Sequence, residues 1–270
     1  SLQEVRGGRD KIHLNDPAII IDKIDLEFTL YDSGIKPIAR TLLGPIGKLG
    51  FGDHRTFTAL KGVDFTLHKG EVMGLIGNNG SGKSTLLQCM AGIIQPSKGV
   101  VRSEAEPFLL AGVGTGYSSG LTGRENIILL GTIIGKSKDE VEDKIPELVE
   151  FAELEDWIDE PLKTYSSGMN ARLGMAGIAY FRPDVLLIDE VLGVGDPTFK
   201  EKSKAKIMEM VREASTVMMA SHSHNLLIEI CDRIVFLEKG MIKAIGDPKD
   251  VIDVYYGRKD PSEVAPIKSD

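Results

Sequence analysis

A glycine-rich loop in the first third of the chain carries residue types suited to binding phosphate. Residues 77–85 read Gly-Asn-Asn-Gly-Ser-Gly-Lys-Ser-Thr and match the pattern G-x-x-x-x-G-K-[ST] between a predicted strand and a predicted helix. Glycines there let backbone N–H groups turn inward around phosphates, and the helix N-terminus adds the positive end of its dipole. Lys83 supplies a point charge to the β- and γ-phosphates, and the Ser84 hydroxyl is a ligand for Mg²⁺. The predicted nucleotide contacts are Gly77, Asn78, Asn79, Gly80, Ser81, Gly82, Lys83, Ser84 and Thr85.

Two adjacent acidic residues follow an apolar segment farther along the chain. Residues 185–188 form a continuous apolar run of the kind that is buried in parallel sheets, and Asp189 and Glu190 come directly after it. Open α/β sheets bind their ligands at the carboxyl ends of strands, so Asp189 is predicted to hold Mg²⁺ through a water. Glu190 is predicted to act as general base or to polarise the attacking water. The alternative, that the two acids only cap the next turn, is disfavoured by the presence of the phosphate loop.

The pattern of apolar residues predicts strands and helices that alternate around both motifs, which indicates an α/β fold. Strands are predicted at 18–31, 57–67, 71–76, 185–188 and 216–220, with 100–110 mostly extended, 57–67 and 71–76 as a strand pair, and 233–246 as a hairpin. Helices are predicted at 83–91, 123–135, from Ser137 onward, and at 170–181, 198–214 and 225–231.

Composition excludes several classes of protein. The 270 residues carry a net charge of −8, which argues against nucleic-acid binding and against direct binding to acidic lipid. No apolar run approaches the roughly 18 residues that a membrane span needs, so any membrane role must run through a protein partner. Cys89 and Cys231 stand far apart in apolar contexts, so we expect neither a disulfide nor a metal site from them, as in a reducing cytosol.

The order of five motifs resembles the nucleotide-binding subunit of an ABC transporter. These are 77–85, the signature Tyr-Ser-Ser-Gly-Met at 165–169, 185–190, Asp196 and His222. The resemblance implies a P-loop NTPase (RecA-like) core with an antiparallel β subdomain and an α-helical signature subdomain. The implied domain limits are a flexible arm at 1–17, the ATPase domain at 18–257 and a flexible tail at 258–270. Within the ATPase domain, the β subdomain spans 18–76 and contains an insert at 33–53. The helical subdomain spans 112–180, and the remainder of the domain is the RecA-like core.

The resemblance also assigns roles to the signature residues. In that family the Ser and Gly of the signature face the γ-phosphate that is bound to the opposite protomer, so two copies form a homodimer around two ATP molecules. Ser166, Ser167 and Gly168 match these positions, and the following helix aims its N-terminal dipole at the phosphate. Asp196 matches the acid of the D-loop, which crosses the dimer interface.

Two single residues complete the implied site. His222 matches the switch histidine, which contacts the γ-phosphate and joins Lys83 and Glu190 as catalytic, whereas the nearby His224 is interpreted as structural. For the aromatic ring that stacks on adenine, Phe28 aligns best and Tyr31 is the alternative. Such stacking contributes about 1–3 kcal/mol per base.

The variant of the signature narrows the resemblance further. Tyr-Ser-Ser-Gly-Met, with Leu-Thr-Gly-Arg-Glu-Asn at 121–126 and Val-Leu-Gly-Val-Gly-Asp at 191–196, is similar to ATPases that export bacterial O-antigen, capsule and teichoic acid. The similarity implies two separately encoded integral-membrane subunits and a place at the cytoplasmic face of the inner or plasma membrane. Those relatives carry an insert with a short helix near the membrane portal, and 38–43 falls there; the alternative is a surface loop with a helical turn. We expect the exporter to lack a carbohydrate-binding domain, because the chain ends at Asp270.

One departure from the family concerns the Q-loop, which normally offers a Gln to Mg²⁺. No Gln occurs after Gln95, and Gly-Val-Gly at 112–114 occupies the expected place, so water or backbone must fill the Mg²⁺ shell.

The alternatives to a polysaccharide exporter are an exporter for another substrate class, an ATPase acting on ribosomes or DNA, and an inactive regulatory cassette. The single cassette without heptads disfavours the second, and the intact Lys83, Asp189 and Glu190 disfavour the third.

Overall fold

The computed structural model describes residues 16–30, 55–111, 117–181, 183–189 and 216–264, with 199, 201–203, 205–206 and 209. Several features that the sequence predicts lie outside these residues. They are most of the N-terminal arm, Tyr31, the insert at 33–53 with its segment 38–43, the segment 112–114, Glu190, Asp196, most of the predicted helix 198–214, and residues 265–270 of the tail.

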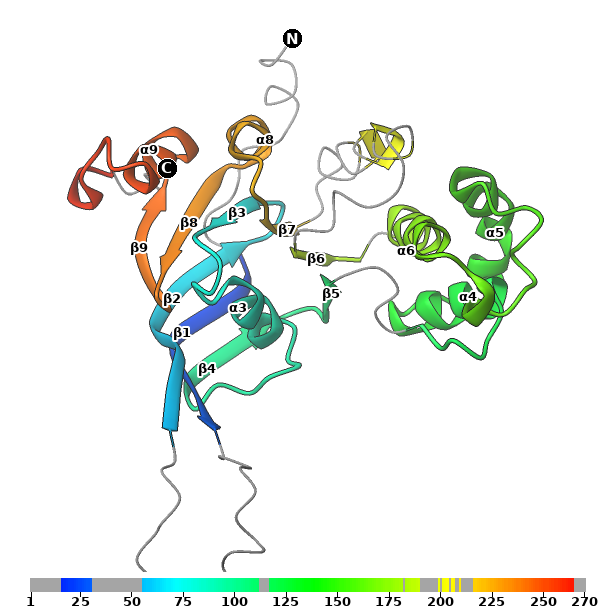
Figure 1. Ribbon diagram of the computed structural model, residues 1–270, viewed down its shortest axis with the longest axis horizontal. Coiled ribbons are helices and arrows are strands. Elements are labelled where there is room, and N and C mark those ends of the chain that lie inside the picture. Colours follow the sequence, from blue (N-terminus) through cyan, green and yellow to red (C-terminus); the bar gives the residue numbers. More distant parts are fainter. Residues whose placement is uncertain are drawn as a thin grey trace, which may run out of the picture.

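The described strands form two sheets (Figure 1). The smaller sheet is antiparallel and has the order β2-β1-β4, with β1 at Pro17–Leu30, β2 at Arg55–His68 and β4 at Lys98–Ser103. The larger has the order β5-β6-β7-β3-β8-β9, in which β9 pairs antiparallel with β8 and the other pairs are parallel. Its strands are β3 (Val72–Ile76), β5 (Pro107–Ala111), β6 (Val185–Asp189), β7 (Thr216–Ala220), β8 (Arg233–Glu238) and β9 (Met241–Gly246). The predicted hairpin at 233–246 is thereby confirmed.

The interpretation of 57–67 and 71–76 as a strand pair is wrong. β2 pairs antiparallel with β1, with Phe57 opposite Phe28, whereas β3 lies between β7 and β8 and is parallel to both. Every residue of β3 is buried, as in the centre of a parallel sheet, while the second half of β2 alternates between buried and more exposed residues. The turn at 69–70 therefore carries the chain from one sheet to the other.

The described helices include the predicted ones at 83–91, 123–135, from Ser137 onward, 170–181 and 225–231, with shifts at their ends, and also one at Pro248–Tyr255, which the sequence did not predict. They are α3 (Lys83–Met90), α4 (Gly123–Ile133), α5 (Lys138–Ala152), α6 (Ser167–Phe181), α8 (His224–Ile230) and α9 (Pro248–Tyr255), with short 3-10 helices η2 (Leu162–Thr164) and η4 (Pro261–Glu263). Ser137 and Glu140 form the predicted capping box of α5, and Thr122 and Glu125 form another at α4. Figure 1 shows α4, α5 and α6 grouped to one side of β5 and β6. None of the described helices combines the length and apolar character that crossing a bilayer requires.

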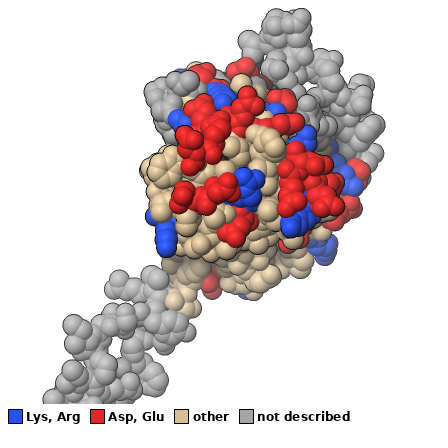
Figure 2. Space-filling model, turned by 90° about the vertical axis from the view of Figure 1, so that its right-hand side faces the viewer, with Lys and Arg blue, Asp and Glu red and all other residues tan. Residues whose placement is uncertain are grey.

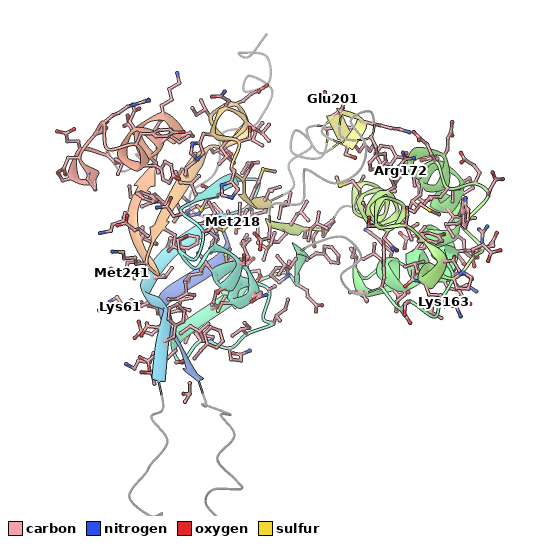
Figure 3. The ribbon with its side chains drawn as sticks, in the orientation of Figure 1. Lys61, Lys163, Arg172, Glu201, Met218 and Met241 are labelled. Atoms are coloured by element: carbon pink, nitrogen blue, oxygen red, sulfur yellow. The ribbon has the colours of Figure 1, made fainter. Side chains whose placement is uncertain are left out.

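Alternate residues of the larger sheet enter two separate hydrophobic cores. Met73 and Leu75 of β3 pack with β1, β2 and α3, and so does Met218 of β7, which is labelled in Figure 3. Val72 and Ile76 point to the other face and pack with the helices α4, α5, α6, α8 and α9. Each such fully buried side chain contributes about 1.5–3 kcal/mol. The sheet that carries the phosphate loop is therefore fixed from both sides.

A buried ion pair joins the two sheets at the edge away from the strand carboxyl ends. Glu71, which is 0% exposed, precedes β3 and accepts from Arg233 at the start of β8, with Nη2 to Oε2 at 2.9 Å. The same Nη2 donates to the Thr66 carbonyl oxygen of β2 at 2.7 Å. Removing one member of a buried pair typically costs about 3–5 kcal/mol, so this network anchors β2 against β3 and β8.

Candidate functional site

The phosphate loop connects β3 to α3 and packs tightly at both of its ends. Gly77 has φ of 154°, and a Cβ atom there would lie 2.2 Å from the carbonyl oxygen of Leu237 on β8. Gly82 has φ of 106°, and its Cβ would lie 2.8 Å from the carbonyl oxygen of Ala59 on β2. Both positions therefore require glycine. Around Gly80, between them, a Cβ atom would meet nothing within 4 Å, so the middle of the loop has an open side.

Lys83 lies at the start of α3 with its side chain folded over the loop. Its Nζ donates to the carbonyl oxygens of Gly77 at 2.8 Å and of Asn78 at 3.4 Å. The Asn78 carbonyl also accepts the Ser81 N–H at 3.0 Å, which closes the loop into a compact turn. Lys83 is 8% exposed, and within the described part of the chain its side chain bonds to carbonyl oxygens rather than to a carboxylate. The loop therefore holds a buried positive charge.

Two further features of the loop fit a phosphate group. The Ser81 hydroxyl is buried and has no hydrogen-bond partner among the described residues. α3 begins after Gly82 without a side-chain cap, so its first backbone N–H groups are placed to donate to a ligand. Leaving a buried polar group unpaired costs about 1–3 kcal/mol, so such groups are normally bonded. An anionic phosphate matches this set of donors beside the Lys83 ammonium.

Three neighbouring parallel strands bring other predicted site residues to the same edge of the sheet. Leu75 of β3 lies opposite Ala220 of β7, and Ala220 lies opposite Asp189 of β6. Gly77 follows β3 directly, and His222 follows β7 closely. Since neighbouring strands lie about 4.8 Å apart, Asp189 and the start of the phosphate loop are about 10 Å apart across β7. Asp189, His222 and the phosphate loop therefore share the carboxyl edge.

The signature loop begins α6. In the view of Figure 1, β6 lies between α6 and α3. The Ser166 Oγ accepts the Met169 N–H at 3.2 Å, as an N-cap residue does. The helix therefore starts at Ser167, three residues earlier than the sequence predicts. Ser166 and Ser167 are exposed, and the closest atom that a Cβ at Gly168 would meet is the Ser166 Oγ, at 3.8 Å. The loop thus presents two hydroxyl groups and an open glycine on the surface.

Tyr165 shows why this motif begins with an aromatic residue. Its side chain is buried, and its hydroxyl donates to the Trp157 carbonyl oxygen at 2.6 Å. A Cβ atom at Gly123 would lie 2.4 Å from the Tyr165 hydroxyl, so the start of α4 packs directly against it. Burial, and then the charges of Asp159 and Glu160, raise the pKa of Tyr165 to about 12, which keeps the hydroxyl protonated as a donor. Tyr165 therefore tethers the signature loop to the loop after α5.

His224 packs inside an aromatic cluster beside His222. The His224 Nδ1 lies 2.9 Å from the Tyr256 hydroxyl, and its ring centroid lies 4.9 Å from that of Tyr255. Burial and the neighbouring His222 lower the pKa of His224 below its usual value. The His224 N–H donates to the His222 carbonyl oxygen at 3.1 Å. The cluster therefore fixes the backbone that carries His222.

Phe28, the better candidate for adenine stacking, lies on β1 and is 38% exposed. Phe57, which faces it across the strand pair, is 54% exposed. A ring is therefore accessible near this end of the smaller sheet. Tyr31 lies outside the described residues, so the choice between Phe28 and Tyr31 stays as the sequence left it.

Sequence reasoning missed the helix α9 and its last residue. The Tyr255 hydroxyl donates to the Asn78 Oδ1 of the phosphate loop at 3.0 Å. Asp247 caps α9 and Pro248 is its first residue, a helix-start signal that could have been found. The contact itself joins residues that are 177 positions apart, so no local pattern announces it.

Comparison with known proteins places the chain in a family. The family model described as ABC transporter matches residues 60–193. The O-antigen export system ATP-binding protein RfbB of Klebsiella pneumoniae is 38% identical over 242 residues, which are 88% of this chain and 97% of that protein. The chain belongs to the ABC transporter family. It carries the ATP-hydrolysing, nucleotide-binding domain of that family.

Other similar proteins agree with this assignment. This chain is 38% identical to the teichoic acids export ATP-binding protein TagH of Listeria innocua, over 88% of this chain and 69% of that protein. It resembles the solved structure of an ATP-binding subunit of an ABC transporter with a TM-score of 0.69, at 20% identity, over 90% of this chain and 94% of the other. The structure of a dimeric ATP-binding cassette bound to ADP and Pi gives a TM-score of 0.66 at 19% identity, over 85% of this chain and 98% of that one. At these identities the solved structures show the shared P-loop NTPase fold alone.

Proposed function

We propose that this chain hydrolyses ATP as a homodimer to drive the export of a bacterial cell-surface polysaccharide through two separate membrane subunits. The observation that carries the proposal is the contrast between the two loops. The phosphate loop buries Lys83 and the Ser81 hydroxyl, which has no partner in the described part of the chain, whereas the signature loop exposes Ser166 and Ser167. Each loop thus supplies one half of an ATP site, and Figure 1 shows the two helices they begin well apart in one chain.

In the proposed site, the phosphates of ATP lie in the loop of residues 77–85. Lys83 offsets the charge of the β- and γ-phosphates, while the Ser81 hydroxyl and the first N–H groups of α3 donate to their oxygens. Ser84 and Asp189 would hold Mg²⁺, which when bound neutralises phosphate charge; carboxylate and hydroxyl oxygens are the ligands that it prefers. Phe28, or Tyr31, would stack on the adenine.

Hydrolysis would proceed by attack of a water on the γ-phosphorus, with cleavage of its bond to the β–γ bridging oxygen and release of ADP. Glu190 is proposed as the group that orients this water and accepts its proton, and it directly follows Asp189 at the carboxyl edge of the sheet. His222, at the same edge, would contact the γ-phosphate. A positioned base of this kind typically contributes about 10²–10⁴-fold in rate.

The second half of each site would come from the partner subunit. Ser166, Ser167 and Gly168 of one chain would approach the γ-phosphate bound to the other, with the positive end of the α6 dipole behind them. Asp196 would cross the same interface. Closure would thus require ATP in both phosphate loops, and hydrolysis would let the pair separate.

The exported substrate is inferred from the relatives. Similar proteins are named for the export of O-antigen and of teichoic acids. An ATPase of this kind would sit at the cytoplasmic face of the inner or plasma membrane, bound to the membrane subunits through the insert at 33–53 and the segment 112–120. The ATPase domain would comprise 18–257, between the arm and the tail.

The charge of one face of the molecule argues against the alternative of an ATPase that acts on ribosomes or DNA. Figure 2 shows the face on the side of the helices α4, α5 and α6, where acidic side chains outnumber basic ones. A surface of this sign repels the phosphate backbone of a nucleic acid. We therefore infer a protein partner rather than a nucleic acid.

The dimer is tested with Glu190→Gln, which removes the proposed base and keeps the phosphate loop. With ATP and Mg²⁺ this variant is expected to elute from a sizing column as a dimer, while its phosphate release falls by about 10² or more. The double variant Lys83→Ala, Glu190→Gln is the control and should stay monomeric. If Glu190→Gln binds ATP and remains monomeric, the two-chain site is wrong.

The transport role is tested in a bacterium from which the gene is deleted. Returning the parent gene should restore the surface polysaccharide, and returning Lys83→Ala should leave the polymer inside the cell, as measured on gels of surface and internal fractions. Restoration by Lys83→Ala would contradict an export step driven by ATP.

A further inference from the structure

The last residue of α9 touches the phosphate loop, and α9 itself is firmly held. Asp247 caps the helix by accepting the N–H of Lys249 at 2.9 Å. Val251 and Ile252 are buried, and α9 packs against both β8 and β9. Because this helix is anchored in the core, Tyr255 at its end has a fixed position.

From that position Tyr255 reaches a residue on which the loop depends. Its hydroxyl donates to the Asn78 Oδ1 at 3.0 Å. The Asn78 carbonyl oxygen accepts both the Ser81 N–H at 3.0 Å and the Lys83 Nζ at 3.4 Å. A shift of Asn78 would therefore move the acceptor of the lysine and the turn that holds the Ser81 hydroxyl.

The ring of Tyr255 is held on three sides by other aromatic rings. Its centroid lies 4.9 Å from that of His224 and 5.3 Å from those of Phe236 and Tyr256, and all three contacts are edge-to-face. Edge-to-face contacts of this kind are favourable beyond the burial of the rings. The rings thus fix the direction in which the Tyr255 hydroxyl points.

We propose that Tyr255 is a positioning residue, which holds Asn78 so that the phosphate loop keeps the shape that binds ATP. This inference rests on the proposed function, because it assumes that the triphosphate binds in this loop. Through His224 the same ring also braces the segment that carries His222, since the His224 N–H donates to the His222 carbonyl oxygen. The Tyr255 side chain therefore contacts both the phosphate loop and the histidine that supports the His222 segment.

The test is Tyr255→Phe, which keeps the ring contacts and removes the hydroxyl. The KM for ATP should rise about two- to tenfold, the range that one hydrogen bond provides, while kcat changes by less than twofold. A merely structural role would lower the melting temperature without this split between KM and kcat. Tyr256→Phe is the matched control, because its hydroxyl faces His224 instead of Asn78. It should leave the KM within twofold of the parent value, and any effect that passes through His224 to His222 should appear in kcat instead.

A double-mutant cycle with Asn78→Ala locates the effect. If the hydrogen bond carries it, Tyr255→Phe should change the KM little in the Asn78→Ala background. An unchanged KM for Tyr255→Phe in the parent background, or an equal rise in both backgrounds, overturns the inference while leaving the ATPase proposal intact. If the parent chain neither binds nor hydrolyses ATP, both are overturned.

Discussion

The phosphate loop and the signature loop each place a serine and a glycine at the start of a helix, yet the chain holds them in opposite ways. In the first, Ser81 and Lys83 are buried, and Gly77 is pressed against the neighbouring strand β8. In the second, Ser166 is exposed, and a Cβ atom at Gly168 would meet no atom of the described residues closer than the Ser166 Oγ at 3.8 Å. The difference fits our proposal that the first loop binds the phosphates of its own chain and that the second meets the nucleotide of a partner subunit. Three experiments test that contrast, and a fourth concerns the histidine segment that follows β7.

The largest effect is expected from Lys83→Ala. Loss of the buried ammonium should reduce phosphate release by at least about a hundredfold, because one donor at a site of developing charge contributes 10²–10³-fold or so. Its bonds inside the loop are to carbonyl oxygens, so the fold should survive. Lys163→Ala, on the exposed side of the helical part (Figure 3), is the control and should behave like the parent. Hydrolysis by Lys83→Ala would remove the phosphate loop from the mechanism.

A pair of glycine variants should separate the two loops most clearly. Gly77→Ala places a Cβ atom 2.2 Å from the Leu237 carbonyl oxygen and should lower the free energy of unfolding by about 1–3 kcal/mol or more, with loss of ATP binding. Gly168→Ala meets no close atom of the described chain, so unfolding should change by about 0.5 kcal/mol or less. Its ATP binding should persist while hydrolysis falls.

Denaturant unfolding and ATP titration measure both variants. If Gly168→Ala lost ATP binding as a monomer, the signature loop would act within its own chain, and the contrast would fail.

A smaller effect is expected behind the signature loop. Tyr165→Phe removes the hydrogen bond to the Trp157 carbonyl oxygen and should cost about 0.5–1.5 kcal/mol in the free energy of unfolding. Hydrolysis should fall several-fold while ATP binding by the monomer is unchanged, because the tether supports only the signature loop, which we propose acts on the nucleotide of the partner subunit. Tyr117→Phe, whose hydroxyl donates to the Leu173 carbonyl oxygen at 3.4 Å, tests whether any lost tyrosine hydroxyl in this helical part has the same effect. Equal hydrolysis losses in both variants would count against a special role for Tyr165.

The smallest effect concerns pH. Burial lowers the pKa of His224, so the folded chain binds this proton less readily than the unfolded chain does. Its contribution to stability is therefore present above the unfolded pKa near 6.5 and is lost as the pH falls below it. His224→Phe should flatten the pH dependence of unfolding as the pH falls below about 6.5. An unchanged slope would mean that another group, such as His68 with its lowered pKa, dominates this range.

Several parts of the fold were predictable because their signals are local. The phosphate loop follows from the spacing of its glycines and Lys83, and the capping box of α5 from Ser137 and Glu140. The pairing of β2 with β1 was not predictable in this way, because it depends on contacts across an intervening segment of 24 residues. The adjacency of 57–67 and 71–76 in sequence favoured the wrong pair.

The parts of the candidate site that lie in sequence motifs could be predicted. The contacts that depend on packing between distant residues could not. Asp189 and His222 were placed at the carboxyl edge by the strands that precede them. The tether of Tyr165 and the contact of Tyr255 with Asn78 depend on the burial of one hydroxyl and the direction of another. Neither is encoded in a periodicity, so only the three-dimensional structure reveals them.

The two capping boxes have a consequence for the order of folding. Thr122 with Glu125 and Ser137 with Glu140 cap the starts of α4 and α5 from within a single turn. The Gly123 and Arg124 N–H groups at the start of α4 donate to the Glu160 and Ile158 carbonyl oxygens, which are much closer in sequence than the partners of β1 in β4. β1, by contrast, finds β4 only when Ile19 meets Ser103, across most of the first hundred residues. Closing so long a loop is slow. We therefore expect the helical part of the chain to acquire its shape before the smaller sheet does, so the signature loop, which we propose meets a second subunit, would form ahead of the sheet that flanks the phosphate loop.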